Sequence, residues 1–194
     1  NDNILNEAHP HLGTDKLPGI ISNIRKSILN AGGQYILEKK VTDLLIDGDS
    51  ITGVETSDNE KFHSSYVILA TGHSARDIYD ICRNRGVELE MKPFAMGVRG
   101  EHPQELIDKI QYHGNSRGEF LPAASYNLAK QIDGRGVYSF CMCPGGFIVP
   151  SATLQEEVVV NGMSPSGRNS PYANSGIVVE IRPEDLIKYS KSCE

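Results

Sequence analysis

The feature that most constrains the fold is the continuous apolar run Tyr66–Ala70, which ends abruptly at Thr71 and Gly72. A run that is apolar on both faces and rich in β-branched residues is typical of a strand buried in a parallel sheet. Small residues after such a strand let a ligand lie against the backbone, where open α/β sheets bind their ligands. Ala70–Gly72 alone is equally consistent with a tight strand-to-helix turn, because a three-residue motif is weak evidence.

The segments around this run complete an α/β pattern. A helix is predicted from Thr14 to the Gly32-Gly33 stop, with one apolar stripe formed by Ile20, Ile21, Ile24, Ile28 and Leu29. Short β runs at 35–37, 41–46 and 51–56, the last two joined through Asp47-Gly48-Asp49, predict an antiparallel meander. A second helix is predicted from Ser74 to Asn84, closed by Gly86.

Beyond Pro93 the sequence changes to alternating strands. A strand is predicted at Phe94–Arg99, followed by a helix that begins at His102-Pro103 and buries Leu106, Ile107 and Ile110. Further strands are predicted at 137–142, 147–149, 158–160 and 177–181, and the segment 161–174 is predicted to be an exposed loop. The change of pattern predicts two domains, 1–92 and 93–194.

Charge, apolar run length and cysteine content indicate which partners and surroundings to expect for this chain. The net charge of −6 and the pI near 5.5 leave no basic field for phosphates, so nucleic acid is not expected as a partner. The apolar runs are too short to span a membrane, and a soluble, cytoplasmic protein is expected. The cysteines, Cys82, Cys141, Cys143 and Cys193, are too few and too irregular for a disulfide framework, so reduced thiols are expected.

Several separated blocks resemble one family. The segment Val67–Gly72 resembles the second nucleotide-contacting motif of flavoproteins with two dinucleotide-binding domains. Four further blocks resemble, in order, the bacterial family of FAD-dependent, NAD-utilising dehydrogenases: Gly72–Asp77, Lys92–Arg99, Tyr138–Gly146 and Val158–Ser164. The resemblance covers nearly the whole chain.

The resemblance implies a fold and a reaction. Residues 1–92 would form a partial Rossmann-like FAD-binding domain with a β-meander, and 93–194 an incomplete, β-rich, mixed α+β substrate domain. The G-x-G-x-x-G turn that binds the pyrophosphate in such proteins is not present in this sequence. The chain is therefore expected to be an internal piece that lacks N- and C-terminal segments of its parent and is inactive alone. FAD would bind the full-length protein but not this piece, and hydride transfer would involve an unidentified substrate, with NAD(P) as a candidate electron partner.

The resemblance also implies cofactor-binding residues. Val41 would contact the adenine through its backbone, and Ala70, Thr71 and Gly72 would line the ribose and pyrophosphate. His73 and Arg76 would follow at a helix start that faces the same crevice. The alternative for His73 and Arg76 is a solvated first helical turn.

Four residues are candidates for catalysis: Arg99, His102, Cys141 and Cys143. The period of two along a strand places both thiols on one face, opposite a flavin or within the core. Arg99 offers a guanidinium that could clamp a carboxylate or form a surface salt bridge, and His102 offers a base. No metal site is expected, because no second cysteine pair or close histidine pair completes a set of four ligands.

Two other functions remain open. The chain could be a small-molecule or protein binding module that carries a vestigial nucleotide motif. It could also belong to an RNA-modifying flavoprotein, since such enzymes share the fold of the superfamily. The acidic charge counts against RNA, because phosphate contacts require basic residues.

Overall fold

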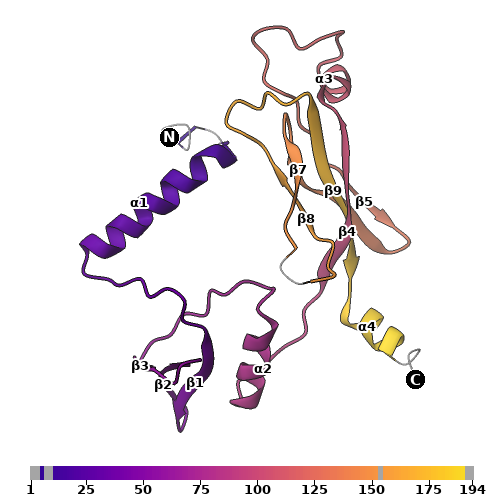
Figure 1. The fold of residues 1–194 in the computed structure, drawn as a ribbon. Helices are drawn as coiled ribbons and strands as arrows, with labels where there is room; N and C mark the ends of the chain where they lie inside the picture. The colour runs from indigo at the N-terminus through magenta and orange to yellow at the C-terminus, as the bar shows by residue number, and fades with distance from the viewer. Residues whose placement is uncertain (1–4, 7–10, 153–154, 191–194) are drawn as a thin grey trace. The chain divides into compact units, whose positions relative to one another are not determined.

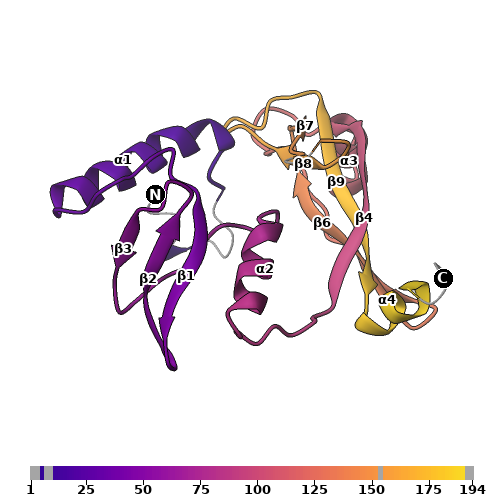
Figure 2. The same cartoon turned by 60° about the horizontal axis from the view of Figure 1, so that its bottom comes forward.

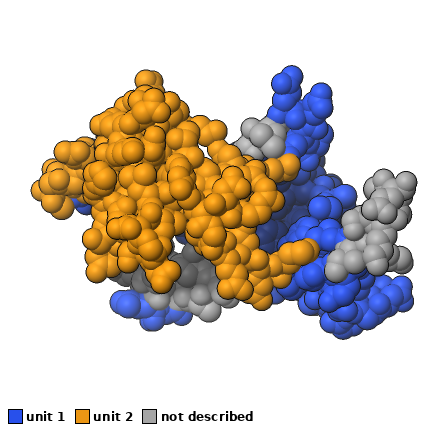
Figure 3. Space-filling model, turned by 90° about the horizontal axis from the view of Figure 1, so that it is seen from below, with its two compact units in different colours: residues 1–27, 92–194 blue, residues 28–91 orange. Residues whose placement is uncertain are grey.

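The computed structural model describes residues 5–6, 11–152 and 155–190, without the side chains of 187–190. These residues form two compact units, one of residues 28–91 and one of residues 1–27 together with 92–194 (Figure 3). The division into domains 1–92 and 93–194 stays a prediction about a longer protein, because compact units are defined by contacts within this chain alone. Cys193 lies outside the described residues.

The predicted first helix is present. A short 3-10 turn, η2 (Thr14–Lys16), leads into α1 (Leu17–Asn30), and Gly32 follows with φ +83°, a conformation that glycine adopts without strain. None of the residues of α1 is buried, and Ile21, Ile24, Ile28 and Leu29 are all exposed. The predicted apolar stripe is therefore not covered by the described chain.

The predicted three-stranded meander forms in the unit 28–91, but one of its three strands is not the predicted one. Strands β1 (Val41–Asp47), β2 (Ser50–Thr56) and β3 (Lys61–His63) pair antiparallel in the order β1-β2-β3 (Figure 1). The prediction of a strand at 35–37 is wrong, and β3 takes the third place. A turn in which Asn59 has φ +64° returns the chain onto β2, and the polar sequence Lys-Phe-His gave no apolar alternation to reveal a strand.

Helix α2 (Arg76–Asn84) lies beside β1 (Figure 2). Cys82 is its buried residue, at 6% exposure, whereas Tyr79, which the sequence places on the same face, is half exposed. Arg85 donates through Nε to Asp43 Oδ1 at 2.6 Å and so ties the end of the helix to β1. The second predicted helix is thus confirmed, with its start at Arg76 instead of Ser74.

The predicted parallel strand does not form. Residues 66–70 have no strand partner in the described chain, and Tyr66 and Ile68 are 88% and 91% exposed. A strand that is apolar on both faces needs neighbouring strands and covering layers, and the described residues supply neither. All described strand pairs are antiparallel, so the fold is mixed α/β and the Rossmann-like sheet remains a prediction.

The unit that contains 92–194 is built on a four-stranded antiparallel sheet in the order β4-β9-β6-β5. Its strands are β4 (Phe94–Pro103), β5 (Ala129–Ile132), β6 (Arg135–Cys143) and β9 (Tyr172–Ile181). A smaller sheet of β7 (Phe147–Pro150) and β8 (Val160–Met163) packs against it, as Figures 1 and 2 both show. The helices are α3 (Gln104–Tyr112) and α4 (Pro183–Ser190).

Packing in this unit corrects two predictions. Helix α3 buries Gln104, Ile107 and Asp108, whereas Leu106 and Ile110 are about half exposed. Ile107, Ala124 and Ala173 form a small apolar cluster, and the polar residues of α3 bond to the chain beside it. The segment 161–174 is not an exposed loop, because it includes most of β8 and the start of β9 and buries Ser164 and Asn174.

Among the described residues, no helix is both long enough and apolar enough to cross a bilayer.

Candidate functional site

The segment expected to contact a nucleotide is open. Ala70, Thr71 and Gly72 are exposed, and Gly72 has φ +78° with no atom within 4 Å of the position where a Cβ would lie. A ligand can therefore approach this backbone without displacing side chains of the described chain. A side chain at Gly72 would be strained by the backbone and would also occupy the free space.

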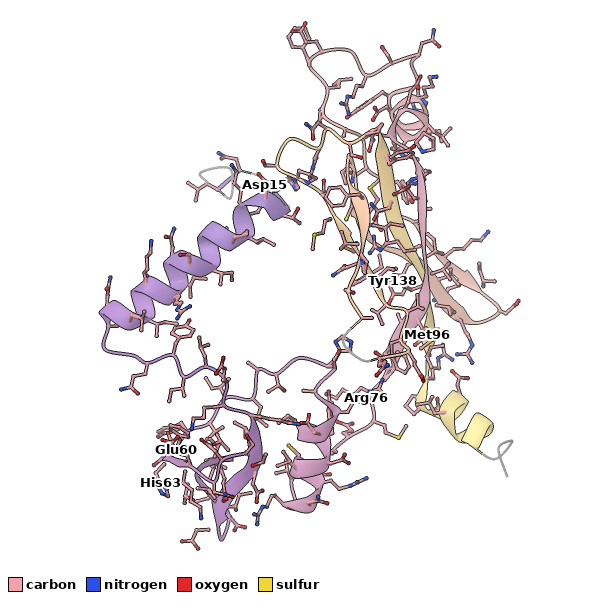
Figure 4. The ribbon with its side chains drawn as sticks, in the orientation of Figure 1. Asp15, Glu60, His63, Arg76, Met96 and Tyr138 are labelled. Carbon is pink, nitrogen blue, oxygen red and sulfur yellow. The ribbon has the colours of Figure 1, made fainter. Side chains whose placement is uncertain are left out.

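The other predicted cofactor residues lie on neighbouring elements of the same unit. Val41 is the first residue of β1, pairs with Thr56 and is partly buried. Arg76 begins α2 and is exposed (Figure 4). Lys40 Nζ lies 2.7 Å from Asp77 Oδ2, so an ion pair joins the start of β1 to the first turn of α2. The fold thus brings Val41 to the helix start that carries Arg76.

His73 is also exposed, and its Nε2 lies 3.4 Å from Ser74 Oγ. This environment is equally that of a solvated turn, and the two interpretations of His73 and Arg76 stay open.

A second cluster lies across the large sheet. Arg99 on β4 donates from Nη1 to the Cys141 carbonyl oxygen at 2.9 Å and to Asn174 Oδ1 at 2.7 Å. Because β9 lies between β4 and β6, this guanidinium reaches over β9 to the neighbouring strand. Nη1 of Arg99 therefore donates hydrogen bonds to the protein itself. Within the described chain it forms neither the carboxylate clamp nor the surface salt bridge that the sequence suggested.

The two thiols sit at a break in β6. The pairing of β6 with β9 is irregular between Phe140 and Cys143, and Cys141 adopts φ +50°, so the regular two-residue period is interrupted. Cys141 is exposed and Cys143 is buried, yet their Sγ atoms are only 3.9 Å apart. The sequence predicted that strand alternation would place both thiols on one face. The sulfurs do lie close together, but a bulge in β6 brings them there and not the regular alternation of a strand.

The environments of the two thiols differ. Burial, together with the neighbouring Cys141, raises the pKa of the Cys143 thiol from its usual 9.0 to about 11, although the Arg99 guanidinium acts in the opposite direction. Cys143 Sγ donates to the Cys141 carbonyl oxygen at 3.4 Å. Cys143 is thus held as a neutral thiol, and Cys141 is the sulfur that reagents can reach.

His102 belongs to a different set of contacts. Its Nδ1 lies 2.7 Å from the Ala173 carbonyl oxygen, and its Nε2 lies 3.0 Å from the Tyr126 hydroxyl. Both ring nitrogens are therefore engaged in hydrogen bonds that join β4 to β9 and to the 113–128 segment. The described contacts do not bring His102 together with Arg99 or the thiols.

Sequence reasoning missed Asn174 and Gly162. Asn174 is fully buried, and its Nδ2 has no hydrogen-bond partner among the described residues. A Cβ at Gly162 would clash with Arg99, with Asn174 and with Cys143, so only glycine fits there. Both residues fall in the segment predicted to be an exposed loop. The pairing of β4 with β9 brings Asn174 to Arg99, and the packing of the β7–β8 sheet on the large sheet brings Gly162 there.

A buried polar network supports the turn that follows Cys143. Gln104 Oε1 accepts from the Gly145 N–H at 2.7 Å, and Gln104 Nε2 donates to Asp108 Oδ1 at 2.8 Å. Asp108 Oδ1 also accepts from the Ala124 N–H at 2.8 Å. The carboxylate and the amide thus satisfy backbone groups from two other segments of the chain. In the part of the chain that the structure describes, no three His, Cys, Asp or Glu side chains group as metal ligands would.

Comparison with known proteins defines the class. Residues 93–193 match the family described as FAD-dependent protein, C-terminal domain-like. The half of the chain built on the β4-β9-β6-β5 sheet is therefore a flavoprotein-associated domain, and the chain belongs to this family. An uncharacterized protein of Clostridium beijerinckii is 40% identical over 182 residues, which is 93% of this chain and 34% of the relative. The chain thus spans about a third of the length of that relative.

Proposed function

We propose that this chain is part of a flavin-dependent oxidoreductase that transfers hydride through FAD. The membership of residues 93–193 in an FAD-dependent family is the observation that carries the proposal. Bound FAD accepts and returns a hydride, and the protein binds and orients the cofactor and the substrate. NAD(P) is the proposed electron partner, and the β-rich part would hold a substrate of unknown identity.

The residues of this chain fit one flank of the cofactor. The open backbone at Ala70–Gly72 would lie against the ribose and pyrophosphate, with Val41 near the adenine and His73 and Arg76 at the adjoining helix start. The sequence has no G-x-G-x-x-G turn, whose backbone N–H groups bind a pyrophosphate. We therefore expect residues 1–194 alone to bind FAD more weakly than about 1 μM, or about −8 kcal/mol, in calorimetric titration. Submicromolar, saturable binding would contradict this expectation.

The proposal is tested on the full-length protein that contains this chain. It should purify with the visible absorbance of bound flavin or take up FAD on reconstitution. A colourless protein that cannot be reconstituted would overturn the oxidoreductase proposal and favour a binding module.

A matched pair of variants tests the cofactor flank. Gly72→Val should abolish flavin retention, because it places a branched side chain against the proposed cofactor surface. Gly48→Val is the control: Gly48 also has a positive φ, +57°, and open space around it, but lies at the β1–β2 turn. Equal flavin content in the two variants would show that Gly72 does not face the cofactor.

A further inference from the structure

A cavity of about 370 Å³ lies in the unit that contains 92–194. Arg117, Arg168 and His11 contribute its polar lining, and the consecutive residues Leu121–Ala123 contribute an apolar wall. Among the residues that the structure describes, no aspartate or glutamate lines it. The cavity thus combines cationic side chains with an apolar surface, which is the usual composition of a small-molecule site.

Each of the two arginines has one buried nitrogen without a hydrogen-bond partner among the described residues. Among the described residues, Arg168 has no ion pair, and its Nε is buried without a hydrogen-bond partner. Arg117 Nη1 is also buried without a hydrogen bond, although it forms an ion pair with Asp108 Oδ2 at 3.6 Å. Asp108 already accepts hydrogen bonds from Gln104 and Ala124 through its other oxygen. The charge of Arg168 is therefore not balanced by an acid among the described residues, and an anionic ligand in the cavity would balance it.

The segment that carries Arg168 is held in place. Arg168 N donates to the Pro165 carbonyl oxygen at 3.0 Å, and the Arg168 backbone packs so closely on Gly145 that no Cβ fits between them. The Asp15 carboxylate accepts from Ser166 N and Oγ at 2.6 and 2.7 Å, and these bonds hold the pKa of Asp15 below its usual value. Asp15, at the start of the helical segment, is labelled in Figure 4. Asp15 takes the donors of Ser166, and His11 Nε2 lies 2.9 Å from the Pro165 carbonyl oxygen. The arginines therefore supply the charged donors for a ligand.

We propose that this cavity binds the carboxylate of a small organic acid. A guanidinium donates two parallel N–H groups that match a planar carboxylate, and two arginines line the same cavity. The apolar body of the acid would lie against Leu121–Ala123, which inorganic phosphate could not use. This site does not depend on the flavin proposal, and nothing in its lining involves residues 28–91.

Butyrate and inorganic phosphate are the probes, titrated into residues 1–194 and followed by backbone amide NMR. Butyrate should bind saturably, shift the amide signals of Gly167 and Arg168, and bind more tightly than phosphate. If butyrate gives no saturable shifts of the amide signals, or shifts the signals of exposed arginines outside the cavity equally, the proposed site is wrong. Tighter binding of phosphate would overturn the organic-acid assignment.

Arg168→Gln should weaken butyrate binding by about tenfold, since it removes a charged donor. Arg83→Gln is the matched control, because Arg83 is an exposed arginine on α2 that forms an ion pair with Asp80 and does not line the cavity. Arg168→Lys keeps the charge and should give an intermediate affinity, and it serves if Arg168→Gln unfolds. Unchanged affinity in both Arg168 variants would refute the proposal.

Discussion

The two units of this chain differ in which side chains they bury. In residues 28–91 the buried side chains are few, Leu44, Thr56 and Cys82, while the apolar residues Tyr66 and Ile68 are almost fully exposed. The other unit buries polar side chains, among them Gln104, Asp108, Ser164 and Asn174, and most of their polar atoms are hydrogen-bonded within the unit. The first unit therefore lacks partners for its most apolar segment, whereas the second forms hydrogen bonds to many of its buried polar side chains with its own residues.

The largest effect on stability is expected from a substitution that disrupts the buried polar network of the second unit. Asp108→Ala removes an acceptor from Gln104 and Ala124 and the nearest acid of Arg117, and should lower the free energy of unfolding by about 4 kcal/mol. Urea unfolding followed by circular dichroism measures this change. Asp80→Ala, at an exposed acid on α2, should change stability by less than about 0.5 kcal/mol. Similar losses in the two variants would mean that the network does not stabilise the unit.

The next effect tests whether residues 66–70 find partners elsewhere. Ile68→Asp should change the stability of residues 1–194 by less than about 0.5 kcal/mol, because Ile68 is 91% exposed. In the full-length protein the same change should cost about 3 kcal/mol, if Ile68 is buried there in a parallel sheet. Thermal unfolding of both proteins gives the comparison. An equally small effect in both would show that the segment stays exposed and would remove the support for a Rossmann-like sheet.

The smallest effect concerns thiol reactivity rather than stability. Among the described cysteines Cys141 is exposed, whereas Cys143 and Cys82 are buried, so a maleimide at pH 7 should modify Cys141 before these two. With a pKa of about 11, Cys143 holds about a hundredfold less thiolate at this pH than a thiol with a pKa of 9.0. Mass spectrometry of timed samples locates the label. Equally rapid labelling of Cys143 would contradict its burial, and loss of full-length activity in Cys141→Ser would favour a redox role for the pair.

Local patterns in the sequence predicted the elements that local rules control. The helix that ends before Gly32, the hairpin of β1 and β2, the helix before Gly86 and the strands β4, β6, β7 and β9 all occur close to their predicted positions. These features depend on turn residues and short-range periodicity, which a single sequence carries. Strands β3 and β5 were missed, because short polar strands are stabilised by the strand beside them.

The candidate site was only partly readable from sequence. The sequence drew attention to Arg99, Cys141, Cys143 and Gly72 as residues of unusual chemistry or position. Asn174 and Gly162 carried no local signal. Asn174 joins Arg99 through the pairing of β4 with β9, and Gly162 through the packing of the β7–β8 sheet on the large sheet. Arg117 and Arg168 likewise line one cavity although 51 positions separate them.

What the sequence by itself determined is the local order of helices, turns and strands, and the family resemblance of its blocks. The tertiary structure decided which faces are buried, and it placed a bulge where strand alternation alone predicted two thiols on one face. The reason is that burial and hydrogen-bond satisfaction depend on neighbours far away along the chain. For the run Tyr66–Ala70 the described residues offer no such neighbours, and an apolar sequence alone does not make a strand.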